Sequence, residues 1–195
     1  MFENIGYINP DWLAGFSNTF KYKNFSLSVL LDFRHGGNVF NVDMFYGMGT
    51  GLYPETTAKN DLGNPMRNSI EEGGGIIFDG VQEDGSVNYT RVRADHYGVL
   101  GWVRMPAAGF IYDAGYVKLR EMIFTWSVPD KLVRKIGVVK NIDVSLTGHN
   151  LWILHKNVPY ADPEYFAGAG NYAFGFQAGT YPAVRYYGFN LRVDF

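Results

Sequence analysis

The chain has 195 residues and a formal net charge of -2, so it offers no basic surface for binding nucleic acid. It contains no cysteine, which excludes a disulfide framework and thiolate metal sites. Aromatic residues make up 17% and charged residues only 18%, whereas soluble proteins are usually about 25% charged. With 24 glycines, this composition favours strands joined by turns and loops.

Two strands are predicted first, over about residues 11–22 and 25–35, because apolar and polar residues alternate in both. The phase of this alternation inverts after Lys23-Asn24. In a hairpin with a two-residue loop, the residues that flank the loop lie opposite each other and share a face. One apolar face, which includes Phe20 and Leu27, therefore continues across both strands.

Two further strands are predicted over about residues 116–128 and 142–154. Apolar side chains fill one face of the lower half of the first of these strands, while its upper half carries Lys118, Arg120 and Glu121. We interpret the charged half as standing above a lipid bilayer, after a bulge in the strand. A short basic connection with one helical turn is expected between the two strands.

The last predicted strand, over about residues 184–195, alternates strictly and ends on Phe195. A terminal strand that is apolar on one face and ends on an aromatic residue is typical of outer-membrane β-barrels. We predict that this strand carries an assembly signal for the barrel-assembly machinery; the simpler alternative is a last lipid-facing strand. The elements of the signal are Tyr187, Gly188, Phe189, Leu191, Val193 and Phe195.

Short and long connections alternate along the chain, as they do in outer-membrane barrels with short periplasmic turns and long extracellular loops. We therefore predict an all-β fold: about five C-terminal strands of a large transmembrane antiparallel β-barrel, with residues 36–115 and 155–183 as extracellular loops. Five strands cannot close a barrel, and an open sheet in lipid leaves backbone groups unpaired. The chain is thus expected to be the C-terminal part of a larger barrel, with Met1 not its native start.

Motifs in a fixed order resemble the C-terminal end of SusC/RagA-type TonB-dependent outer-membrane transporters of Bacteroidetes. They include Gly15 to Asn18, Gly36 to Asn41, Tyr116 to Glu121, Trp126 to Pro129, Gly148 to Trp152 and Asp162 to Glu164. His149 stands where Arg or Gln is expected, which is a small departure.

This resemblance implies a barrel of about 22 strands that is filled by an N-terminal plug. It also implies energy from the TonB complex and a lid formed by a SusD-like surface lipoprotein. The cargo would be a glycan or a peptide that is too large for passive porins. The plug and the segment that contacts TonB would lie N-terminal to this chain.

Aromatic residues near the strand ends are predicted to form girdles at the two membrane interfaces, with sugar stacking as the alternative. They are Trp12, Tyr22, Phe25, Phe33, Trp126 and Trp152. In the long loops, contacts with cargo or with the lid are predicted for Phe45, Tyr46, Trp102 and Tyr172, with packing inside the loops as the alternative. Asp84-Gly85, between Val81 and Val87, predicts a small hairpin in the first loop.

No catalytic motif, cofactor motif or metal-ligand spacing is present, so we predict that the chain is not an enzyme. A soluble, secreted glycan-binding β-sandwich is the alternative function. The two interpretations differ in the environment of six apolar side chains, which a transporter exposes to lipid and a sandwich buries against a second sheet. These side chains are Phe16, Phe20, Leu27, Val29, Phe189 and Leu191.

Overall fold

The computed structural model describes residues 4–95, 100–101, 105–164 and 175–195. The chain divides into two compact units, a sheet unit and a loop unit. The sheet unit comprises residues 6–39, 113–166 and 180–195, and the loop unit comprises residues 1–5, 40–112 and 167–179.

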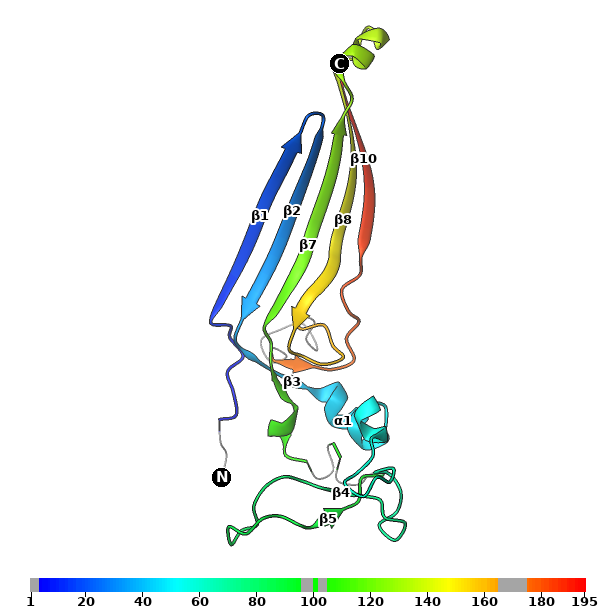
Figure 1. Cartoon of the computed structure of the whole chain (residues 1–195). Helices are drawn as coiled ribbons and strands as arrows, with labels where there is room; N and C mark the ends of the chain where they lie inside the picture. The colour runs from blue at the N-terminus through cyan, green and yellow to red at the C-terminus, as the bar shows by residue number, and fades with distance from the viewer. Residues whose placement is uncertain (1–3, 96–99, 102–104, 165–174) are drawn as a thin grey trace. The chain divides into compact units, whose positions relative to one another are not determined.

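Five long strands form the sheet unit (Figure 1). They are β1 (Trp12–Tyr22), β2 (Phe25–His35), β7 (Tyr116–Ser127), β8 (Asn141–Lys156) and β10 (Tyr186–Asp194). The order across the sheet is β1-β2-β7-β8-β10, and every neighbouring pair is antiparallel. The prediction of about five antiparallel strands is confirmed. Within the described residues, β1 and β10 each pair with one strand, so the sheet has two open edges.

The strand register aligns apolar side chains in rows that cross the whole sheet. One row runs through Phe20, Leu27, Phe124, Leu146 and Phe189. The row beside it runs through Tyr22, Phe25, Trp126, Val144 and Leu191. Because successive residues of a strand point to opposite faces, these alternate rows lie on one face and the residues between them lie on the other. The sheet therefore has one continuous apolar face.

Short connections join β1 to β2 and β7 to β8. Lys23, in the two-residue turn, has a φ of 53°, and a positive φ at this position suits the right-handed twist of the flanking strands. After β7, Pro129 precedes α2 (Asp130–Val133) and η3 (Arg134–Ile136), which lead into β8. The helical turn expected in this connection is present.

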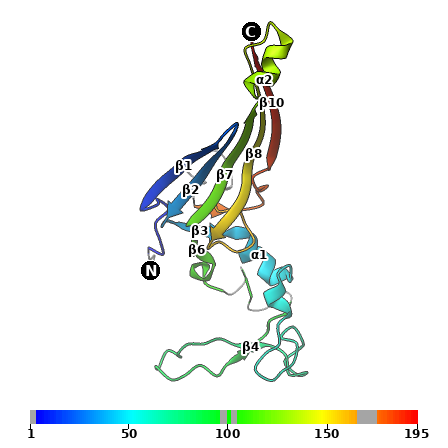
Figure 2. The ribbon, with the colours of Figure 1, turned by 45° about the horizontal axis from the view of Figure 1, so that its top comes forward.

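In the sheet, β7 lies between β2 and β8 (Figure 2), and its register with both neighbours is interrupted in its first half. Leu119 and Glu121 pair with successive residues of β2, so Arg120 has no partner in that strand. On the other side, Leu119 pairs with Trp152 and Glu121 with His149, and Asn150 adopts a φ of 52°. These irregularities are β-bulges, which bend a strand and turn its side chains.

The loop unit consists of short elements. It contains α1 (Val42–Thr50), η1 (Pro54–Thr57), β4 (Ile76–Ile77), β5 (Arg91–Val92), η2 (Ala107–Phe110) and β9 (Phe176–Gln177). The boundary with the sheet unit falls within β3 (Asn38–Asn41), and β6 (Ile111–Asp113) reaches that boundary as well. Asn41 caps α1 by accepting a hydrogen bond from the Met44 N–H at 3.0 Å, and Gly51 ends the helix with a φ of 82°. The helix was not anticipated from the sequence.

A small hairpin in the loop unit agrees with the sequence. Val81 and Val87 form an antiparallel bridge, and Asp84 accepts hydrogen bonds from the backbone and hydroxyl of Ser86 at 2.9 and 2.6 Å. Gly85 has a φ of 84°, which a glycine adopts without strain. None of the helices in the described ranges is long and apolar enough to cross a membrane.

Candidate functional site

The apolar face of the sheet is largely uncovered. Phe20, Leu146 and Phe189 are 59%, 58% and 66% exposed, and Phe124 is 42% exposed. Together these side chains form one row with the half-buried Leu27. Monomeric soluble proteins rarely expose a contiguous apolar patch of this kind, because each Å² of apolar surface in water carries a cost.

The six apolar side chains whose environment distinguishes a transporter from a sandwich are half-buried or exposed. Phe16, Phe20, Phe189 and Leu191, in the edge strands, are all more than half exposed. Leu27 and Val29, in β2, are half-buried. None of the six has the burial that a sandwich core requires, so the exposure favours a membrane-facing sheet.

The predicted interface aromatics lie towards the two ends of the sheet. Tyr22, Phe25 and Trp126 are neighbours in one row at the end where β1 turns into β2. At the opposite end, Trp12 stacks on His35 with a centroid distance of 5.2 Å. Phe33 and Trp152 lie in the same half of the sheet as Trp12, Phe33 half-buried and Trp152 62% exposed. This distribution matches two girdles, and the membrane role of these residues stays a prediction.

The predicted assembly signal lies in the edge strand β10. Its apolar members alternate along one side of the strand, with Tyr187 and Phe189 at 76% and 66% exposure. Phe195, beyond the end of β10, is 74% exposed. Gly188 points to the other face, where a Cβ would meet the Thr147 hydroxyl. Leu191 and Val193 continue the apolar side of β10, and recognition by an assembly machinery stays a prediction.

Polar side chains pair across the opposite face of the sheet. The hydroxyls of Thr19 and Ser28 are 2.8 Å apart, and so are those of Thr125 and Ser145. Such cross-strand pairs contribute roughly 0.2–1 kcal/mol each. The polar face is therefore stabilised by individual hydrogen bonds, whereas the apolar face exposes hydrocarbon side chains.

A cluster of charged side chains gathers on the polar face beside the bulge. The Arg120 guanidinium donates to Asp32 of β2 and to both carboxylate oxygens of Glu164, at 2.6 and 2.9 Å. Arg120 also donates to the side-chain oxygen of Asn150 at 3.2 Å. A guanidinium presents five donors in a planar fork, so one bulged residue can hold three acceptors from different segments.

Lys118, two residues earlier in β7, extends this cluster. Its ammonium donates to Asp162 and to Glu164, both at 2.5 Å, and its side chain is only 5% exposed. The Tyr116 hydroxyl donates to Glu164 at 2.9 Å. We call Tyr116, Lys118, Arg120, Asp32, Asp162 and Glu164 the charged cluster. It fastens the connection after β8 to the polar face of the sheet.

Electrostatics inside the charged cluster favour the ionised form of Glu164. Burial acts to raise the pKa of the Glu164 carboxyl, but hydrogen bonds from Arg120 and Lys118 act in the opposite direction and hold this pKa at about 2. The carboxylate therefore stays negative at neutral pH. Removing one partner from a buried charged group leaves the other uncompensated, which is strongly destabilising.

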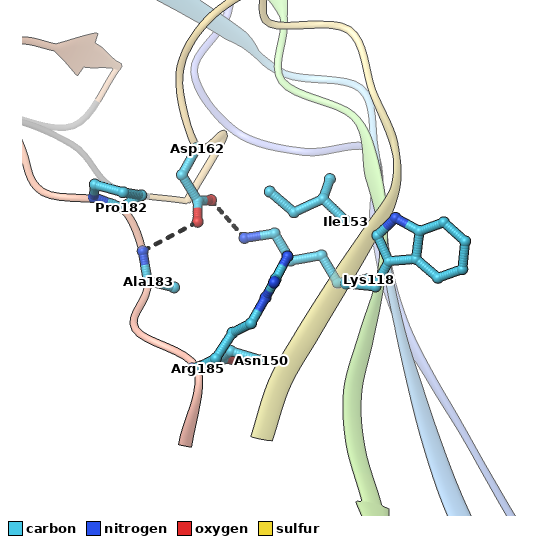
Figure 3. Close-up of a pocket in the computed structure, with 8 residues that line it drawn as sticks. Lys118, Asn150, Ile153, Asp162, Pro182, Ala183 and Arg185 are labelled. Carbon is cyan, nitrogen blue, oxygen red and sulfur yellow. Dashed lines mark hydrogen bonds and ion pairs between the residues drawn. The ribbon is translucent and has the colours of Figure 1, made fainter. Parts of the chain in front are cut away.

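A pocket of about 270 Å³ opens next to the charged cluster, where the chain before β10 separates from β8 (Figure 3). Lys118 and Asp162 line one side of it, and Ala183 and Arg185 line the other. The backbone N–H of Ala183 donates to Asp162 at 3.4 Å. Asp162 thus links β7 to the segment that leads into β10.

The loop residues predicted to contact cargo or a lid differ in their surroundings. Phe45 contacts the rings of Phe40, Phe110 and Tyr46 at centroid distances of 5.2–5.4 Å. These contacts agree with the alternative that Phe45 packs inside the loops. Tyr46 is 51% exposed and borders a groove of about 510 Å³ together with Asp43, Leu52 and Tyr53. Trp102 and Tyr172 lie outside the described residues. A ligand role stays a prediction for all four.

The charged cluster was not predicted from the sequence, although several of its members were noticeable there as single charged residues. Lys118 and Arg120 interrupt the apolar alternation of β7, and Asp162 and Glu164 stand in a connection. The only sequence signal for the charged cluster was that the cations of β7 and the carboxylates of the connection after β8 have opposite charges. Among the described residues, no group of three or more metal-ligating side chains could hold a metal ion.

Comparisons with known proteins show that the chain is similar to part of two TonB-dependent receptors. It is 24% identical to TonB-dependent receptor P3 of Formosa agariphila and 28% identical to TonB-dependent receptor P26 of the same organism. Each alignment covers 98% of this chain but only 17% and 18% of the relatives. The chain thus spans less than a fifth of the length of these receptors. No family model matches it.

Solved structures show the same fold. The chain superposes on a RagAB peptide importer in its closed-closed and open-open states with TM-scores of 0.63 and 0.59. Sequence identity is 19% and 18%, and the match covers 96% of this chain and 18% and 17% of the other. The chain therefore has the fold of a segment that makes up less than a fifth of these structures. The relatives are named as receptors, and the matched structures as a peptide importer.

Proposed function

Since the chain has the sequence and fold of a SusC/RagA-type TonB-dependent receptor segment, we propose that it forms part of an outer-membrane importer of large nutrients. The importer works with a SusD-like surface lipoprotein and takes its energy from the TonB complex, which it contacts through parts outside this chain. Its cargo is an oligosaccharide or a peptide. The chain itself contributes a section of the barrel wall.

One observation carries this proposal: an exposed apolar face that is continuous across five strands, from Phe20 to Phe189. Hydrocarbon is the environment in which such a face is stable, and the alternation of apolar and polar faces is the pattern of barrel strands. The two open edges support the same conclusion, because strands in lipid need a partner on each side. The edges of β1 and β10 would pair with further strands of the complete barrel.

The polar face would then line the interior of the barrel. There the charged cluster holds the connection after β8 against the wall through Asp162 and Glu164. The loop unit, with its groove at Tyr46, would offer contacts to cargo or to the lid. The alternating strand that ends at Phe195 would be read by the barrel-assembly machinery.

Lipid contact is tested by probes on the two faces of the complete receptor in nanodiscs. Leu146→Cys and its neighbour Ser145→Cys are each labelled with an environment-sensitive fluorophore, in a background where the introduced cysteine is the only reactive one. The label at 146 is expected to be quenched by nitroxide lipids, and the label at 145 is expected to be quenched only by a water-soluble quencher. Equal responses of the two labels would contradict a membrane-facing sheet.

Import is tested separately in cells. A strain that lacks the receptor gene is compared with the same strain carrying it, using fluorescent peptides and fluorescent oligosaccharides of several lengths. Uptake that depends on both the receptor and TonB is expected for one of these classes. Uptake that continues without TonB would contradict the proposed mechanism.

A further inference from the structure

The connection between β7 and β8 combines exposed apolar side chains with a cluster of cations. Leu132 is 49% exposed, Ile136 53% and Val138 72%. We call residues 130–140 the basic turn, because Lys131, Arg134, Lys135 and Lys140 supply four cations against the single carboxylate of Asp130. Exposed apolar groups and cations on one short segment are the two attractions that hold a peptide at a lipid surface.

The apolar side chains of the basic turn differ in their burial. The α-helical turn α2 leads directly into the 3-10 turn η3, and Leu132 and Ile136, one in each turn, are both about half exposed. Val133, beside the apolar pair, is 2% exposed, and α2 contacts β8. The basic turn is therefore fixed to the sheet along one side while its apolar pair stays uncovered.

The basic turn lies at the same end of the sheet as one row of its apolar face. It follows the row of Tyr22, Phe25 and Trp126, which lies at the end where the short connections are. At the same end, Lys140 donates to the backbone carbonyl of Phe195 at 2.7 Å and so joins the basic turn to the end of β10. Aromatic residues of barrels gather at the level of the lipid headgroups, which is the level at which this connection emerges.

From this arrangement we infer that the basic turn is a docking surface for anionic phospholipid headgroups. Leu132 and Ile136 enter the boundary between headgroups and acyl chains, and Lys131, Arg134 and Lys135 bind phosphate oxygens. The inference rests on the proposed function, because it needs the sheet to span a membrane with the short connections at one surface. Each lysine or arginine near an anionic surface strengthens binding by about fivefold.

The test uses the complete receptor in nanodiscs, with a fluorophore at Ile136→Cys. The nanodiscs contain either phosphatidylglycerol mixed with phosphatidylcholine or phosphatidylcholine alone. We expect blue-shifted emission and quenching by nitroxide lipids in the anionic nanodiscs, with a clear loss of both in phosphatidylcholine. The combined variant Lys131→Gln, Arg134→Gln and Lys135→Gln should show the same loss in anionic nanodiscs. Asp130→Cys, at a side chain that is 82% exposed, is the control position in the same connection.

Three outcomes would overturn the inference. Water-like emission at 136 in both lipids would show that the basic turn stays in solvent. A label at 136 that neither lipid nor aqueous quenchers reach would show that another part of the receptor covers the basic turn. Equal quenching by nitroxide lipids in anionic and in phosphatidylcholine nanodiscs would show that the cations have no role. A label at Leu146→Cys separates the two proposals: lipid quenching there with none at 136 contradicts the docking surface alone, while no quenching at 146 contradicts the membrane-facing sheet.

Discussion

The two faces of the same five strands are stabilised in different ways. On the apolar face, rows such as Phe20 to Phe189 are exposed, and in the proposed barrel they would gain stability by leaving water for hydrocarbon. On the polar face, stability is concentrated in specific pairs and above all in the charged cluster around Glu164. The first face therefore depends on its surroundings, and the second on partners that come from distant parts of the chain.

The largest effect is expected from a charge on the apolar face. Leu146→Arg would place a guanidinium in hydrocarbon, at a cost of about 2–4 kcal/mol near the middle of a membrane, and would lower the amount of folded receptor in the outer membrane. Urea unfolding in lipid measures the free energy, and heat-modifiable migration on gels measures the folded fraction.

Its matched control is the neighbouring residue on the other face. Ser145→Arg loses the hydrogen bond with Thr125, worth about 1 kcal/mol, but keeps the new charge out of lipid. If Ser145→Arg proved as damaging as Leu146→Arg, the assignment of the two faces would be wrong.

A smaller loss is expected when the charged cluster is broken. Glu164→Gln removes the negative charge that Arg120 and Lys118 share and leaves both cations poorly compensated, which should lower the free energy of unfolding by about 2–3 kcal/mol. The exposed pair of Asp130 and Arg134, at 4.0 Å, supplies the control. Asp130→Asn should leave the stability unchanged within error, because exposed ion pairs contribute little. Equal effects of the two variants would show that the charged cluster is only another surface feature.

Acid should weaken the charged cluster in part. The pKa of Glu164 is about 2 in the folded protein, against 4.5 for the free side chain. Because the folded pKa is the lower one, the stabilisation is complete above about pH 4.5 and is lost as the pH falls towards 2. In unfolding measurements at successive pH values, the gap between the unmodified receptor and Glu164→Gln should narrow below pH 4.5. A gap that stays constant down to pH 3 would contradict the role of the Glu164 charge.

Local periodicity predicted the strands, whereas the long-range pairs could not be read from it. Alternation is visible within ten residues, so the five strands and the turn at Lys23-Asn24 were accessible from the sequence. The pairing of β2 with β7 joins segments separated by some 80 residues, and the bond from Arg120 to Glu164 spans 44. The residues around β2 or Arg120 do not specify that β7 or Glu164 is the partner. The helix α1 was missed because Gly47 and Gly49 are poor helix formers, and here Gly47 lets the Tyr53 ring approach closely.

The smallest effect is expected at the bulge that brings Arg120 into the charged cluster. Asn150 adopts a φ of 52°, a left-handed conformation that asparagine and glycine tolerate and that costs other residues roughly 1–2 kcal/mol. Asn150→Ala and Asn150→Gly both lose the side-chain bonds to Arg120 and to the Val184 carbonyl, so their difference reports the backbone alone. We expect the alanine variant to be less stable than the glycine variant by about 1 kcal/mol in urea unfolding. The reverse order would mean that the bulge does not require the left-handed conformation, and that a regular strand could present Arg120 to the polar face equally well.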